Sequence, residues 1–156
     1  MRTAMAAVLV LLLLAAVAAG VWGYSRWQSA EADLEARADV ARAAETFVVQ
    51  FNTYDTESID DYAESMNELL STSARTAFES QIEDITTLIN ETGLESEGEV
   101  LASAVAALDD DSARVLVVAD AEATSQAGPV QRHFRWEVSM VKVDGEWLVD
   151  DFSAVA

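Results

Sequence analysis

Residues 134–152 read FRWEVSMVKVDGEWLVDDF and carry the pattern that decides the fold. Every second residue from Phe134 to Met140 is apolar, and the residues between them are polar, which is typical of a half-buried strand. The pair Asp144-Gly145 favours a two-residue hairpin turn. A returning strand follows from Trp147 to Phe152. The stretch therefore predicts a β-hairpin with one apolar face.

The segments before this hairpin predict two more strands and three helices. Apolar residues recur first with the helical spacing of three and four, and later with the period of two that strands show. The predicted elements are helices over residues 29–52, 59–70 and 74–92 and strands over residues 100–106 and 113–120. Three helices followed by four antiparallel strands indicate an α+β domain.

Local signals predict where these helices begin and end. Ser58 with Asp61 resembles a capping box at the start of the second helix. The cluster Ser71-Thr72-Ser73 offers N-cap residues for the third helix. Gly93 fits the position just beyond its last turn, where a left-handed residue is common.

An uncharged apolar run over residues 4–23 lies upstream of these elements. About 20 helical residues span a hydrocarbon core of roughly 30 Å. Trp22, Tyr24 and Trp27 follow at once, as aromatic residues at a membrane interface do. We therefore expect residues 1–27 to form a cytoplasmic end and a single-pass transmembrane anchor in the plasma membrane. Residues 28–38 are then a helical stalk, and residues 39–156 an extracytoplasmic α+β domain.

A cleavable signal peptide is the alternative interpretation of the same run. Arg2 would supply its basic end, and Ala16-Val17-Ala18 a small-residue cleavage site. The anchor is favoured because apolar residues continue past that site. Both interpretations export the domain.

The composition excludes several classes of protein. The chain has 28 acidic and 9 basic residues and a net charge of −19. Such a surface repels phosphate backbones, which excludes nucleic-acid binding. The chain has no cysteine, which excludes disulfides, thiol nucleophiles and cysteine-ligated metals.

Three stretches resemble the actinobacterial Mce-associated membrane proteins, small accessory proteins of mammalian-cell-entry (Mce) lipid-uptake systems. They are Phe51–Asp55, Asp109–Val117 and Val141–Phe152, and the similarity extends over nearly the whole chain. The resemblance implies a nuclear-transport-factor-2-like fold, also seen in the periplasmic domain of some type IV secretion proteins. That fold is cone-like, with three helices packed on a curved four-stranded antiparallel sheet. The high acidity departs from the family and is consistent with salt adaptation.

Few residues are candidates for catalysis or for metal binding. His133, the single histidine, falls on the polar face of its strand, where a solvated residue is favoured over a catalytic base. Asp109–Asp111 lacks the spaced ligands of a calcium loop and is better explained as an exposed turn. If the domain were an enzyme of this fold, the candidate catalytic residues would be Tyr54, Asp55, Tyr62 and Asp120. We expect no catalytic, cofactor-binding or metal-binding residues.

Four apolar side chains are candidates for lining a lipid or sterol pocket: Phe134, Trp136, Met140 and Trp147. The alternative is that they only fill the core, since alternating aromatic residues on a strand need burial in either case.

The expected function is that of a non-catalytic, membrane-anchored accessory protein that docks to and stabilises a Mce-type lipid or sterol uptake complex. Its partners would be the membrane, protein subunits of that complex and an apolar lipid, without nucleic acid and without a cofactor. Two alternatives stand beside it. One is an extracytoplasmic lipid-binding module, and the other is a small isomerase- or dehydratase-like enzyme.

Overall fold

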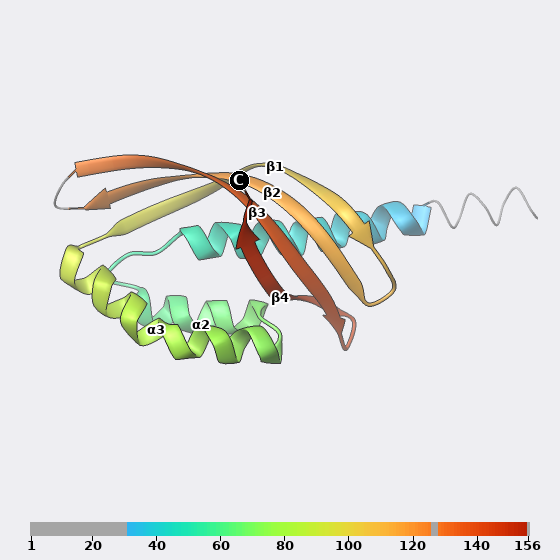
Figure 1. The fold of residues 1–156 in the computed structure, drawn as a ribbon, viewed down its shortest axis with the longest axis horizontal. Helices are drawn as coiled ribbons and strands as arrows, with labels where there is room; N and C mark the ends of the chain where they lie inside the picture. The colour runs from blue at the N-terminus through green and yellow to red at the C-terminus, as the bar shows by residue number, and fades with distance from the viewer. Residues whose placement is uncertain (1–30, 126–127, 156) are drawn as a thin grey trace, which may run out of the picture. The chain divides into compact units, whose positions relative to one another are not determined.

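The computed structural model describes residues 31–125 and 128–155. A helix over residues 31–52 is followed by α2 (Ile59–Leu69) and α3 (Thr72–Thr92). The strands β1 (Glu95–Leu108), β2 (Ser112–Ser125), β3 (Gly128–Val143) and β4 (Glu146–Ala154) then form one sheet (Figure 1). The predicted order of three helices and four strands is confirmed for the described residues.

The chain divides into a short unit, Met1–Ala36, and a larger compact unit, Arg37–Ala156, which holds the sheet. The anchor predicted over residues 1–27 lies outside the described residues. Within the described part of the chain, no helix is both long and apolar enough to cross a membrane.

The four strands form an antiparallel meander in the order β1-β2-β3-β4. The strands are longer than the sequence predicts, because backbone pairing continues beyond the apolar alternation. The register pairs Thr124 with Pro129, so β3 begins six residues before the alternation predicted from Phe134. Register shifts after Val100, Val105 and Ser139 mark bulges, which bend strands and increase twist.

The two faces of the sheet differ in burial. Along β2, every second residue from Ala113 to Ala123 is buried, and Arg114, Leu116 and Val118 between them are exposed. The helices pack on the buried face, which we call the inner face (Figure 1). Phe47 of the first helix meets Phe152 of β4 at 4.9 Å between ring centroids.

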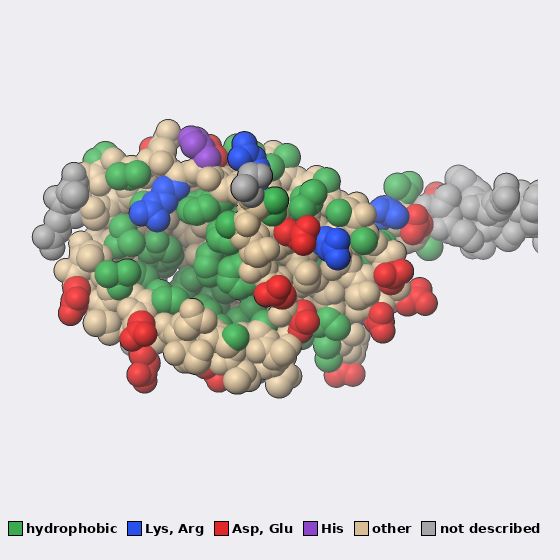
Figure 2. Space-filling view, in the orientation of Figure 1, with side chains coloured by type: hydrophobic (Ala, Val, Ile, Leu, Met, Phe, Trp, Pro, Cys, Tyr) green, Lys and Arg blue, Asp and Glu red, His purple; other side chains and the backbone are tan. Residues whose placement is uncertain are grey.

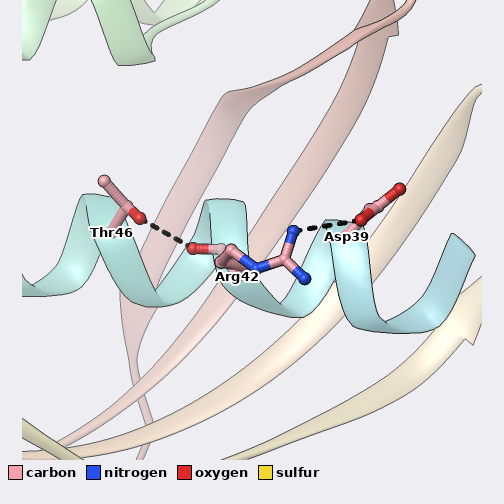
Figure 3. Close-up of polar contacts among 3 residues, drawn as sticks. All are labelled: Asp39, Arg42 and Thr46. Carbon is pink, nitrogen blue, oxygen red and sulfur yellow. Dashed lines mark hydrogen bonds and ion pairs between the residues drawn. The ribbon is translucent and has the colours of Figure 1, made fainter. Parts of the chain in front are cut away.

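The solvent side of the first helix carries polar contacts within the helix (Figure 3). The guanidinium of Arg42 donates to the carboxylate of Asp39 at 3.1 Å. The hydroxyl of Thr46 donates to the carbonyl of Arg42 at 2.9 Å. Val40, Ala44, Phe47 and Val48 lie on the opposite side and are fully buried. The helix is therefore amphipathic.

The ends of α3 confirm two local predictions. The hydroxyl oxygen of Ser71 accepts a hydrogen bond from the Ala74 N–H at 3.2 Å, as an N-cap residue does. Gly93 has a φ of 59°, and its N–H donates to the carbonyl of Ile89.

The predicted capping box of α2 is wrong. The side chain of Ser58 makes no cap hydrogen bond. Asp55 instead organises the turn that precedes the helix. Its carboxylate accepts from the N–H groups of Glu57 at 2.8 Å and Ser58 at 2.7 Å. Hydrogen bonds from Ser58 and Glu57 lower the pKa of Asp55, so the turn keeps its charged acceptor.

The predicted hairpin turn is confirmed. Val143 pairs with Glu146, and the two residues between them have positive φ angles, 52° for Asp144 and 93° for Gly145. Two left-handed residues match the right-handed twist of the strands that they connect.

Candidate functional site

A cavity of about 250 Å³ lies between α3 and the inner face of β3. Ala119 and Ala121 of β2 stand opposite Phe134 and Arg132 of β3 in the register. The wall is formed by side chains of three helices, β3 and two connecting segments: Phe51, Asn52, Tyr54, Tyr62, Ile85, Leu88, Ile89, Leu94, Arg132, Phe134 and Trp136. Figure 2 shows a hollow with largely hydrophobic walls between the sheet and α3.

The four predicted pocket residues are not all brought together. Phe134 and Trp136 line the cavity, and their rings stack at 5.4 Å between centroids. Met140 is buried in the core and does not line this cavity. Trp147 packs further along the same face, where the ammonium of Lys142 lies 5.2 Å from the centre of its ring. One strand face thus contributes both to the core and to the cavity wall.

The indole N–H of Trp136 is a buried donor without an acceptor among the described residues. Buried polar groups are nearly always hydrogen-bonded, so an orphan donor beside a cavity needs an explanation. Tyr62, in the same wall, is satisfied, since its hydroxyl donates to the carbonyl of Phe51 at 3.3 Å. Burial raises the pKa of Tyr62, which keeps its hydroxyl neutral.

Arg132 is the charged residue in the cavity wall. Its side chain is exposed, and no ion pair of its guanidinium is found within residues 31–125 and 128–155. Arg132 is not among the site residues predicted from the sequence. The signal was available, because strand parity places Arg132 on the same face as Phe134 and Trp136.

A second cavity, of about 380 Å³, adjoins the first, since Phe51 and Ile85 line both. Asp150 and Asp151 lie in its wall. The carboxylate of Asp150 accepts from the hydroxyls of Ser73 at 2.5 Å and Ser71 at 2.7 Å. These hydrogen bonds lower the pKa of Asp150 and keep it ionised, and the bond from Ser73 has the larger effect.

The residues considered for enzymatic chemistry do not converge. Asp120 pairs with His133 on the outer face of the sheet, with 2.7 Å between the carboxylate oxygen and Nδ1. Tyr54 and Tyr62 meet beneath the inner face, with their ring centroids 6.0 Å apart. Asp55 is engaged in the turn before α2.

Asp109, Asp110 and Asp111 are exposed between β1 and β2. Within the part of the chain that the structure describes, no three His, Cys, Asp or Glu side chains are grouped to hold a metal ion.

Three helices on the inner face of a four-stranded antiparallel sheet define an α+β domain of the nuclear-transport-factor-2-like class. The chain belongs to the family described as "Uncharacterized protein Rv1363c/MT1408-like", whose model matches residues 2–153. No sequence among the curated proteins matches the chain significantly.

Several solved structures share the fold. An IcmL-like type IV secretion system protein from Legionella pneumophila has a TM-score of 0.66 at 9% identity, over 76% of this chain and 91% of that one. The periplasmic domain of DotI has a TM-score of 0.64 at 13% identity, over 74% and 92%. CagV, a VirB8 homolog from Helicobacter pylori, has a TM-score of 0.58 at 13% identity, over 76% and 97%. At these identities the likeness establishes the fold alone.

Proposed function

We propose that this chain is a non-catalytic accessory subunit of a membrane-associated protein complex in the cell envelope. Its fold is similar to those of an IcmL-like secretion system protein, the periplasmic domain of DotI and the VirB8 homolog CagV. The titratable side chains that an enzyme of this fold would need lie on opposite faces of the sheet. A scaffolding role in an assembly agrees with both observations.

We propose further that the complex is a Mce-type lipid or sterol uptake system, which the domain docks to and stabilises. The resemblance of Phe51–Asp55, Asp109–Val117 and Val141–Phe152 to Mce-associated proteins supports this choice. In this proposal residues 1–27 anchor the chain in the plasma membrane, and the domain lies outside the cytoplasm. Attachment to the membrane raises the effective concentration of the domain beside a membrane-bound partner.

The outer face of the sheet carries the proposal. The described helices pack on the inner face, and on the outer face β1 and β2 keep three large aliphatic side chains open to solvent. Leu101 is 55% exposed, Leu116 40% and Val118 39%. Val118 pairs with Ala102, and Leu116 pairs with Ala104, so these apolar positions adjoin across β1 and β2. A contiguous exposed apolar patch is typical of a protein-binding surface.

The experiment is a co-purification of the tagged full-length chain from its host membranes, with recovered proteins identified by mass spectrometry. The double variant L116D/V118D places charges in the patch. The variant V143D places the same charge at another exposed valine, near the β3–β4 turn, and serves as the matched control. Circular dichroism confirms that each variant is folded.

We expect subunits of a Mce system to be recovered with the wild type and with V143D. Recovery with L116D/V118D should fall by at least about tenfold, because a tenfold loss needs only about 1.4 kcal/mol and a side chain at the centre of an interface can contribute about 2 kcal/mol. Recovery without Mce subunits would refute the proposed complex. Undiminished recovery with L116D/V118D would refute the proposed surface.

The apolar cavity under α3 favours one second candidate function, an extracytoplasmic lipid-binding module.

A further inference from the structure

Among the described residues, the two cavities beneath α3 form the strongest ligand-binding candidate. They measure about 250 and 380 Å³ and share Phe51 and Ile85 in their walls. Small-molecule sites are commonly mostly apolar hollows of about 300–1,000 Å³ with a few polar groups that fix orientation. The walls here meet that description, with aromatic rings from the first helix and β3 and aliphatic side chains from α3.

The two ends of this hollow carry opposite charges. Arg132 lies in the wall of the first cavity, beside Phe134 and Trp136. Asp150 and Asp151 lie in the wall of the second cavity. The field along the hollow therefore attracts an anionic group to the first cavity and repels it from the second. The chain has a net charge of −19, so an anionic ligand is repelled by most of the surface. Arg132 supplies a local positive charge at the first cavity.

A second observation points to the same end of the hollow. The indole N–H of Trp136 is buried and has no acceptor among the described residues. The ring of Trp136 lines the first cavity beside Arg132 of the same strand face. A rotation of the indole would turn its N–H toward an oxygen bound there, and Arg132 would balance the charge of that oxygen.

We propose that the hollow binds a long-chain fatty acid. The carboxylate pairs with Arg132 at the opening of the first cavity. The acyl chain passes Phe51 and Ile85 toward the second cavity. This inference deepens the lipid-binding candidate, and it does not depend on docking through the outer face.

The test is photo-crosslinking of the full-length chain in vesicles of neutral phosphatidylcholine. The first probe is palmitic acid with a diazirine in its chain, and the second is the matching long-chain alcohol, which lacks the charge. Labelled peptides are located by mass spectrometry. The variant R132Q removes the charge from the cavity, whereas R135Q removes a charge from the same strand on the outer face. Both positions are exposed, so neither change disturbs the core.

We expect the acid probe to label peptides that contain Ile85 to Ile89 and Arg132 to Trp136, with competition by unlabelled palmitate. At sub-saturating probe, R132Q should lower this labelling by about two- to fivefold, the range for a partly exposed ion pair, and R135Q should not. The alcohol probe should label the wild type and R132Q equally.

Three results would overturn the proposal. The first is equal labelling of the wild type and R132Q by the acid probe. The second is labelling confined to peptides outside the hollow. The third is competition by vesicles of an anionic phospholipid but not by palmitate, which would identify a phospholipid instead. None of these depends on co-purification with Mce subunits, so this proposal and the docking proposal fail separately.

Discussion

The approach of Gly98 to the first helix gives a sharp prediction for the variant Gly98→Ala. A Cβ atom added at Gly98 would lie 2.5 Å from the Cβ of Asn52, a distance that real Cβ contacts do not reach. Asn52 has little room to withdraw, because it is buried and its amide donates to the carbonyl of Val48 at 2.7 Å. The N–H of Gly98 also donates to the hydroxyl of Thr53 at 3.1 Å, which holds β1 against the end of the helix.

The magnitude follows from the packing. Extra atoms forced into a close-packed site cost about 1–3 kcal/mol. The φ of Gly98 lies outside the left-handed region, so without the clash alanine would be neutral or slightly stabilising. We therefore expect Gly98→Ala to lower the free energy of unfolding by about 1–3 kcal/mol. For a chain of this length, that lowers the Tm by about 2–12 °C.

The assay is thermal and urea unfolding of the full-length chain in detergent micelles, followed by circular dichroism. The control is a double-mutant cycle with Asn52→Gly, which removes the opposing Cβ atom. The coupling energy between the two changes should be favourable by about 1 kcal/mol or more, since the clash exists only when both Cβ atoms are present. A Gly98→Ala variant as stable as the wild type, or a coupling energy near zero, would refute the reasoning.

Three further predictions concern the start of α3 and the cavity. Ser71→Ala removes the N-cap and should lower the free energy of urea unfolding by about 0.5–2 kcal/mol, whereas Thr72→Ala, at an exposed neighbouring position, should change it little. Because the pKa of Asp150 is lowered in the folded state, its carboxylate stabilises the fold above the unfolded value near 3.8, and this contribution is lost as pH falls through the folded pKa. The stability difference between the wild type and Asp150→Asn should therefore shrink when unfolding is measured below about pH 4. Trp136→Phe removes the orphan indole N–H together with part of the ring that packs on Phe51, Phe134 and Phe152, so the two effects should largely cancel and change the free energy of unfolding by less than about 1 kcal/mol, whereas a loss of about 3 kcal/mol would contradict an unpaired N–H.

Much of the fold is readable from the sequence because its signals are local. The alternation from Phe134 to Met140 and the turn at Asp144-Gly145 depend on period and φ alone, and both are confirmed. Strand ends depend on pairing partners instead. β3 begins at Gly128 because Ser125 stands opposite to it, which no local signal reveals.

The candidate site is less readable, because it depends on packing in three dimensions. Strand parity alone places Arg132 beside Phe134, so that pairing was accessible from the sequence. The space in front of them is closed by side chains of the first helix, α2 and α3, which are distant in the sequence. Likewise, the path of the preceding loop decides that the Asp55 carboxylate, and not the Ser58 hydroxyl, accepts the hydrogen bonds before α2.

The contact between Ser71 and Asp150 has a consequence for the order in which the chain folds. The two residues are separated by 79 positions, and the N–H of Ser71 also donates to the carbonyl of Val149. The first turn of α3 therefore lacks its contacts with Val149 and Asp150 until β4 has been made. A nascent chain that ends before Val149 would carry α3 with its N-terminus undocked, and the hollow beneath it would lack one wall. Any ligand that needs this hollow can thus be bound only after β4 has joined the sheet.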